Sequence, residues 1–439
     1  MKKSTNFILS LLMITLVSCA SSVPESAVSS QEYLQNEFSK LTERHFTKIS
    51  ISDFGDGFNH ARYKYENSIP PWPLYDEDQI LGFAENMVYL QNPDGGWTKN
   101  IDLQRKYTLR ELERQKRRNQ DIPPVTYNVL SDKRSSTIDN GNIFSQIKYL
   151  CQVYAQVKNK RGIDSKKYLD CAIRAVQWIF NAQHPRSGGF TGADVYAVTY
   201  NDDVMSETLS VLKDISRAEK DSIYYVIPEQ MRITAGECYR KGLECILKSQ
   251  IELTLPSGEK ILTAWGQQHS HETLKPIWAR EFEPPSVCSA ESFNILRFLM
   301  KEENPTEEIK RAVLAGGEFF SRPEVIIYGR RLKKENIPPV TLGGRTYNTD
   351  QFLVDDETAP ALWARFYALD SSYDVVSGAR KPIQGTYPSV LNPIWCDRGC
   401  AYVNDYNDLS QERRNGYGYV TAAGTKFLQE FERWKTRHL

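Results

Sequence analysis

An internal repeat restricts the fold of this 439-residue chain more than any other feature. Three segments with helical spacing end in a glutamine, at Gln91, Gln183 and Gln250, and each is followed by a turn that carries glycine or tryptophan. Repeats of this kind are typical of stacked helical hairpins, because a single hairpin cannot bury its apolar face alone. We therefore predict one toroid of three helical-hairpin repeats and not three separate domains.

Apolar residues at three- and four-residue spacing support this prediction along most of the chain. The spacing predicts helices at residues 78–91, 142–157, 167–183, 205–216, 232–250, 290–301, 307–320, 357–369 and 421–436. Alternation typical of strands is scarce, so the expected fold class is all-α. Three long polar segments, 104–137, 266–289 and 380–420, are expected to be functional loops between the helices.

The N-terminus has the pattern of an export signal. Two lysines precede a short apolar run that is too short to span a membrane, which predicts a signal peptide over residues 1–18. Leu16 to Cys19 resembles the lipobox of bacterial lipoproteins, in which Cys19 would carry the lipid; the alternative is cleavage near Ala20 with loss of Cys19. Residues 19–45 are predicted to be a tether, and 46–439 a single domain. We expect an exported lipoprotein anchored in the outer membrane and facing the periplasm or the cell surface.

The charge of the chain is balanced, with 55 Lys and Arg against 55 Asp and Glu. This balance argues against nucleic acid as a partner, since such proteins usually show a broad basic surface. A polyanionic partner would have to meet positive charge collected at one site. The cysteines after Cys19 are odd in number, so at least one thiol is expected to be free. Cys396 and Cys400 could form a disulfide within a loop, and no metal role is expected for them.

Two acidic motifs stand directly before predicted helices. Asp139 and Asn140 precede one helix, and Asp202 and Asp203 precede another. Either motif could cap its helix, because these residue types are favoured at that position. Neighbouring carboxylates are also the hard oxygen ligands that Ca²⁺ prefers. The residues alone leave both readings open.

Cationic and aromatic residues cluster in the turns. Trp97 could cap the core or offer its face to a sugar ring, and Lys99 could meet a carboxylate. Arg280, Arg398 and the pair Arg413 and Arg414 could form surface ion pairs of little weight. They could also clamp the carboxylates of an acidic polymer in bidentate fashion.

Taken together, these motifs resemble the pectate lyases of polysaccharide lyase family ten. The matching segments, in that family's order, are 91–102, 137–141, 200–205, 265–286, 364–367 and 413–419. The resemblance implies a partly open (α/α) toroid as the catalytic domain, an acidic polysaccharide (polygalacturonate or pectin) as the partner, and Ca²⁺ as the cofactor. We further expect a monomer whose sole link to a membrane is the lipid anchor.

The resemblance also implies roles for individual residues. Asp139 and Asp202 are similar to the two cleft aspartates of the family, and Asp202, Asp203 and Asp139 are the expected calcium ligands. Arg413 and Arg414 fall at the catalytic base, and Arg414 is favoured because it directly precedes Asn-Gly-Tyr. The expected substrate-binding residues are Lys99, Asp139, Asn140, Arg280, Arg398, Trp97 and Tyr417. Departures from the family pattern occur at Thr98, Asn142, Ile143, Tyr419 and the stretch from His269 to His271.

The implied reaction fits these residue types. Eliminating the 4-O bond of a uronate removes the C5 proton next to a carboxylate, and Ca²⁺ stabilises the charge that develops there. Arginine is an unusual base because its pKa exceeds about 12, so Lys99 is the reserve candidate. Two other functions remain open. A hydrolase could use Asp139 and Asp202 with a water molecule, and a lipid-anchored glycan-binding protein would need no catalysis.

Overall fold

The computed structural model describes residues 46–54, 57–58, 72–120, 135–192, 195–376 and 382–439. The predicted signal peptide, the tether and the lipidation site Cys19 lie outside these ranges. Within them, no helix is both long enough and apolar enough to cross a bilayer.

Eight of the nine predicted helices are present, each within three residues of its expected ends. Local spacing predicts these helices well because each one buries a single apolar stripe. They are α3 (Ile80–Leu90), α5 (Phe144–Val157), α6 (Lys166–Ala182), α7 (Val204–Ser216), α8 (Glu229–Ser249), α9 (Ser289–Met300), α10 (Glu307–Ser321) and α12 (Ala423–His438). The helices α5 and α6, α7 and α8, and α9 and α10 pack as consecutive pairs.

The repeated glutamines explain how these pairs are joined. The side-chain amide of Gln91 donates to the carbonyl of Gly95 in its own turn at 2.7 Å and to a carbonyl in α6 at 2.9 Å. Gln183 donates in the same way to its turn and to α8, and Gln250 to its turn and to α10. Each glutamine therefore bridges its own turn to the backbone of a later helix, and it fixes one helix end against that helix.

Trp97, which follows the first of these glutamines, belongs to the core. Its side chain is fully buried, and its indole Nε1 donates to the carbonyl of Met87 at 2.9 Å. Trp265 makes the equivalent bond to Ile246 after the third glutamine. The prediction that Trp97 offers a face to a sugar ring is therefore wrong, and its alternative reading as a core cap is correct.

The all-α prediction, and with it a toroid made of helices alone, is wrong. A long antiparallel hairpin is formed by β7 (Arg330–Leu342) and β8 (Arg345–Asp355). Gly343 and Gly344 join its strands, and both have positive φ angles, 57° and 79°, as a tight two-residue hairpin turn requires. The register shifts between Asn336 and Val340, where two prolines interrupt the pairing.

The helix predicted at 357–369 is also wrong. That segment forms β9 (Leu362–Ala364) and β10 (Phe366–Tyr367). β9 pairs on one side with β6 (Ile326–Ile327) and on the other with β13 (Val420–Thr421). A short, fully buried apolar run fits either structure by its spacing, and here partners distant in sequence decide for the strand.

The segments expected to be loops contain further short elements. Residues 104–137 include α4 (Leu109–Arg118), which a capping box between Thr108 and Glu111 starts. Residues 266–289 contain β4 (Gln268–His269) and β5 (Val287–Cys288). Residues 380–420 contain β11 (Trp395–Asp397), β12 (Ala401–Val403) and α11 (Gln411–Gly416). Cys396 and Cys400 lie within this last segment. Both are buried free thiols, so the disulfide considered from the sequence is absent.

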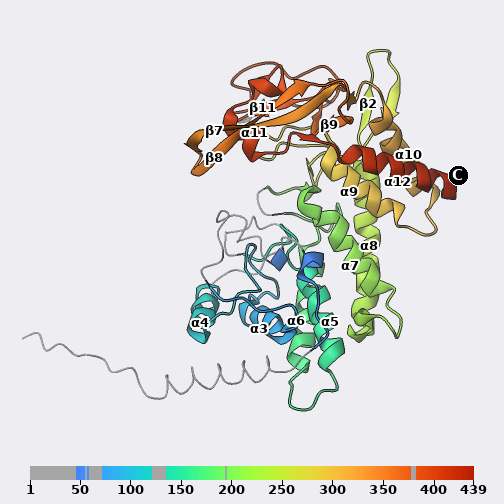
Figure 1. Ribbon diagram of the computed structural model, residues 1–439. Helices are drawn as coiled ribbons and strands as arrows, with labels where there is room; N and C mark the ends of the chain where they lie inside the picture. Colours follow the sequence, from blue (N-terminus) through green and yellow to red (C-terminus); the bar gives the residue numbers. More distant parts are fainter. Residues whose placement is uncertain (1–45, 55–56, 59–71, 121–134, 193–194, 377–381) are drawn as a thin grey trace, which may run out of the picture.

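Figure 1 shows how these elements are arranged. The helices α3 to α6 form one end of the molecule, and the hairpin β7–β8 lies with α11 and the short strands at the other end. The helices α7 and α8 run between the two ends. A small sheet completes this connection, in which β1 (Val198–Thr199) pairs with β4. The turns that carry the predicted site residues come from both ends of the molecule.

Candidate active site

Lys99 and Asp139 form the N-terminal part of the site. The Nζ atom of Lys99 lies 2.6 Å from Oδ2 of Asp139, and the aspartate side chain is nearly buried. Asp139 does not cap the following helix, because α5 begins at Phe144 and its cap position is Ile143. The next residue, Asn140, has a left-handed φ of 56° and donates to the side-chain oxygen of Asn100 at 3.0 Å. The turn before α5 thus holds its polar side chains in contacts with the turn after α3.

Asp202 and Asp203 lie on the 3-10 turn η2 (Asn201–Asp203), just before α7. Both residues have left-handed φ angles, 52° and 56°, which non-glycine residues adopt at a cost. Asp203 occupies the cap position of α7, but its side chain makes no capping bond and instead accepts from Asn294 at 2.8 Å. The capping reading of this motif is thus not what the structure shows. Strain of this kind is typical of functional sites.

The two predicted cleft aspartates face one another. Asp202 as a residue is exposed, but protein atoms crowd its carboxyl, and this crowding together with the negative charge of Asp139 raises the pKa of Asp202 to about 7. Asn140, Asp202 and Asp203 line a hollow of about 440 Å³. Among the described residues, no cluster of three or more Asp, Glu, His or Cys side chains could hold a metal ion. The protein ligands here are therefore few.

A second part of the site surrounds Arg365, between β9 and β10. Its guanidinium pairs with the buried carboxylate of Glu291 and lies 4.6 Å from the ring centre of Tyr417. Burial opposes the charge of Arg365, but the carboxylate of Glu291 outweighs it and holds the pKa of Arg365 above its usual value. The negative charge of Glu291 also contributes to raising the pKa of Asp202 and of Asp203, so the two parts of the site interact electrostatically.

Arg280 joins the same network through Glu283. Its Nε donates to Glu283 at 2.9 Å, and Glu283 also accepts from the hydroxyl of Tyr417 at 2.8 Å and from Gln267 at 2.8 Å. Although burial opposes ionisation, the bonds from Arg280 and Gln267 and the charge of Arg280 lower the pKa of Glu283 to about 2. The side chain of Arg280 is nevertheless 48% exposed, so a ligand can reach it.

The other predicted arginines are held by carboxylates of the protein. Arg398 donates to Glu412 at 2.8 Å and 2.9 Å and to Glu281 at 3.2 Å. Arg413 is buried, pairs with the same Glu412 at 3.0 Å and lies 4.0 Å from the ring centre of Phe282. The hydrogen bonds from Arg398 to Glu412 also raise the pKa of Arg398 above its usual value.

Arg414, the predicted base, is bound most extensively. It pairs with Asp350 of β8 at 2.7 Å, and it donates to the backbone carbonyls of Asn407 at 3.0 Å and of Leu409. Its guanidinium also stacks on the ring of Phe352 at 4.7 Å. Both side chains of the ion pair are largely buried, 11% and 7% exposed. The role of Arg414 as base stays a prediction, and these contacts weigh against it because they bury the guanidinium and occupy its donors.

Sequence reasoning missed three residues of the network. Arg365 stood in a segment that was predicted as a helix, and its neighbouring aromatic residues after Pro360 were the signal for a strand. Glu283 and Glu291 were not singled out: Glu291 is in the first turn of α9, where a glutamate usually serves the helix dipole, and Glu283 lies in a loop. Their importance follows from contacts with Arg280 and Arg365, which lie in separate elements.

Comparison with known proteins bears on this arrangement. Two structures of a family 10 polysaccharide lyase from Cellvibrio cellulosa share the fold at 23% identity. One is a mutant in complex with trigalacturonic acid, with a TM-score of 0.58 over 88% of this chain and 99% of that chain. The other has a TM-score of 0.59 over 88% of this chain and 98% of that chain. A comparison with curated protein sequences gave no match.

A match to a protein-family model shows which family the chain belongs to. The family model described as pectic acid lyase matches residues 91–428, which is well over half of the chain. The match begins at Gln91, the first repeated glutamine, and includes every segment of the site described above. The chain therefore belongs to the pectic acid lyase family, and the protein is a polysaccharide lyase.

Proposed function

We propose that this lyase cleaves polygalacturonate by calcium-dependent β-elimination and releases unsaturated oligogalacturonates. The observation that carries the proposal is the pair of facing carboxylates, Asp139 and Asp202, beside the cation of Lys99 and in one polar network with Arg280. The similar lyase from Cellvibrio cellulosa holds trigalacturonic acid, which is an oligomer of the same acidic sugar. An acidic polymer would account for both kinds of side chain: the cations would bind its carboxylates, and the aspartates would bind the Ca²⁺ ion that those carboxylates also contact.

The acidic side chains of the site fit Ca²⁺ on the condition that water and the substrate complete its coordination shell. Ca²⁺ takes six to eight oxygen ligands, including carboxylates and water. Asp202 and Asp139 would supply two carboxylates, and their mutual repulsion, visible in the raised pKa of Asp202, favours a bound cation. Since the described residues offer no third acidic ligand close enough, water and the carboxylate of the substrate would complete the shell. When bound, Ca²⁺ would withdraw electrons from that carboxylate and acidify the C5 proton.

The cations of the site would position the polymer. Lys99 and Arg280 are both accessible and would bind galacturonate carboxylates, Arg280 with the part of its guanidinium that Glu283 does not occupy. Arg365 is held by Glu291 and stacks on Tyr417, so it would fix the ring of Tyr417 against the substrate. Positioning of this kind supplies part of the rate, because the reacting groups no longer have to meet by diffusion.

The proton acceptor has to reach the C5 atom of the sugar. Arg413 and Arg414 are buried in ion pairs with Glu412 and Asp350. Lys99 and Arg280 are accessible cations of the site, whereas the equally exposed Arg398 is occupied by Glu412 and Glu281. We therefore place the acceptor at one of these two accessible residues and not at Arg414.

The test uses the full-length mature protein and polygalacturonate, with Ca²⁺ or with a chelator. Absorbance from unsaturated uronide ends should grow with Ca²⁺ and stop with the chelator. New reducing ends without this absorbance would show hydrolysis instead. Binding of the polymer with neither signal would show a capture protein and would contradict the proposal.

We also propose that the protein is exported and carries a lipid on Cys19. This proposal rests on the lipobox-like residues Leu16 to Cys19 alone. Mass spectrometry of the protein purified from membranes should show a diacylglyceryl modification on Cys19. The variant Cys19→Ala should lose the modification and appear in the soluble fraction; an unmodified wild-type protein would overturn the proposal.

A further inference from the structure

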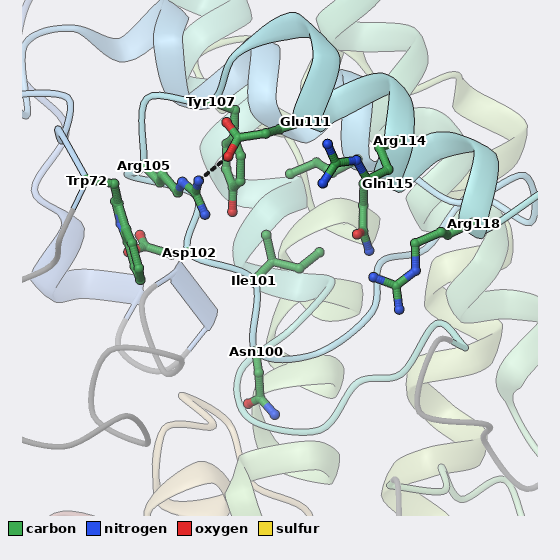
Figure 2. A pocket seen from close by; sticks show the side chains of 11 residues that line it. Trp72, Asn100, Ile101, Asp102, Arg105, Tyr107, Glu111, Arg114, Gln115 and Arg118 are labelled. Atoms are coloured by element: carbon green, nitrogen blue, oxygen red, sulfur yellow. Dashed lines mark hydrogen bonds and ion pairs between the residues drawn. The ribbon is translucent and has the colours of Figure 1, made fainter. Parts of the chain in front are cut away.

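A second pocket lies on α4, outside all the residues assigned so far. It has a volume of about 430 Å³ and is shown in Figure 2. Three arginines line it, Arg105 from the preceding loop and Arg114 and Arg118 from the helix, together with Trp72 and Tyr107. The helix α4 belongs to the long polar segment 104–137 that the sequence predicted to be functional, and the proposed reaction does not use it.

The acidic residues of the pocket are engaged within the protein. Glu111 accepts from Thr108 in the capping box of α4 and pairs with Arg105. Asp102 is buried and accepts from the indole of Trp72 at 3.3 Å and from the backbone of Gln104 at 3.1 Å. Arg114 is exposed, and it forms no ion pair with a residue that the structure describes. Among the residues that line the pocket, three guanidinium groups stand against two carboxylates, and this surplus of positive charge suits an anion.

The aromatic residues hold one guanidinium in place. Arg105 lies 4.8 Å from the ring centre of Trp72 and 4.7 Å from that of Tyr107, so it is stacked between the two rings. Its Nε atom is buried and has no hydrogen-bond partner among the described atoms. A stacked guanidinium loses little freedom on binding a carboxylate. The free faces of partly exposed aromatic rings also suit the apolar side of a sugar.

The pocket is connected to the catalytic cluster. Asn100 lines the pocket and accepts from Asn140, the neighbour of Asp139. The residue before Asn100 is Lys99, which pairs with Asp139 itself. A polymer bound at Lys99 and Asp139 could thus continue past Asn100 toward α4 without leaving the protein surface.

We infer that this pocket is a distal subsite for galacturonate units of the bound polymer, with Arg105, Arg114 and Arg118 as its carboxylate-binding residues. This inference rests on the proposed function, since it takes the polymer to be a polyuronate. A chain with one carboxylate on every sugar matches a row of guanidinium groups, and the stacked Arg105 sets the position of the row. The subsite would raise affinity for long chains and would leave the bond-breaking step unchanged.

The test compares two double variants of α4. Arg114→Gln with Arg118→Gln removes two cations from the pocket, and Arg110→Gln with Arg117→Gln removes the same charge from exposed positions of the same helix that do not line it. Each protein is assayed for unsaturated ends on long polygalacturonate and on trigalacturonate. The pocket variant should raise KM for the long polymer about tenfold at unchanged kcat, and should stay within about twofold on the trimer.

Other outcomes are decisive as well. Equal KM values for the two double variants, or an equal loss on polymer and trimer, would overturn the subsite while the lyase reaction itself stands. A wild-type protein that forms no unsaturated ends on either substrate would instead overturn the proposed function. A shift in KM that the control variant shares would mean general charge attraction, and this also contradicts a built subsite.

Discussion

The ammonium group of Lys99 lies 2.6 Å from the carboxylate of Asp139, although forty residues separate them, and Asp202 faces the same aspartate. Two acidic side chains thus meet beside one ammonium group. Such a centre attracts a divalent cation and is completed by an anionic ligand. The predictions below test this arrangement and the contacts that hold it.

Asp202→Asn should remove the response to calcium. The amide keeps the shape of the side chain but loses the charge that a hard cation needs. We expect kcat/KM on polygalacturonate to fall by about 100-fold or more, since metal-dependent charge stabilisation is worth several kcal/mol. Asp214→Asn is the matched control, because Asp214 is exposed on α7. Titration of activity with Ca²⁺ measures both, and equal calcium responses in the two variants would contradict the assignment.

The raised pKa of Asp202, about 7, predicts a pH dependence of stability without calcium. Between the usual pKa of about 4 and this value, the folded state binds more protons than the unfolded state. The free energy of unfolding of the wild type should therefore fall, relative to that of Asp202→Asn, as the pH rises from about 4 to about 7. Urea unfolding in chelator at several pH values checks this. Parallel curves for the two proteins would refute it.

Arg280→Lys should impair catalysis more than Arg398→Lys. Lysine cannot keep the bidentate contact with Glu283 and also offer a planar group to the substrate. We expect kcat/KM to fall about 10- to 100-fold. The guanidinium of Arg398 is occupied by Glu412 and Glu281, so Arg398→Lys should lower kcat/KM by less than about threefold. Steady-state kinetics on polygalacturonate compares the two, and the reverse order would show that Arg398 binds the substrate.

Arg414→Lys tests the base that the sequence resemblance implied. Because Arg414 ties α11 to Asp350 on β8, we expect a loss of about 2 kcal/mol in stability with activity largely retained at low temperature. Asp350→Asn should destabilise the protein similarly, since it breaks the same largely buried pair. Thermal unfolding and initial rates are measured together. If Arg414→Lys folds normally but loses most of its activity, Arg414 is the base after all.

Gln183→Ala tests the repeated joint between helices. The buried amide of Gln183 donates to Gly188 and to Cys238 at 2.8 Å each, and alanine would remove both of these bonds between the turn and α8. A loss of about 2 kcal/mol in the free energy of unfolding is expected. Gln177→Ala on the exposed face of α6 should change stability by less than about 0.5 kcal/mol. Denaturant unfolding measures the free energy of unfolding of both variants. Equal losses would mean that the hydrogen bonds of Gln183 between its turn and α8 do not stabilise the fold.

The sequence by itself determined the helices, the repeated glutamines and the family. Helical spacing and the motifs around Asp139 and Asp202 can be read directly because they depend on residues close in the chain. The strands could not be predicted in this way. The hairpin β7–β8 contains a bulge with two prolines, and β9 is a strand because β6 and β13 lie on either side of it.

Only the tertiary structure decided what each charged residue does. Arg280 and Arg414 look alike in the sequence, but Arg280 is half exposed beside Tyr417, whereas Arg414 is buried against Asp350. Lys99 and Asp139 likewise become partners solely because α3 and α5 place their turns together. The physical reason is that the chemical role of a charged side chain depends on the groups that contact it and on its access to water. Both are set by contacts between segments that lie far apart in the chain.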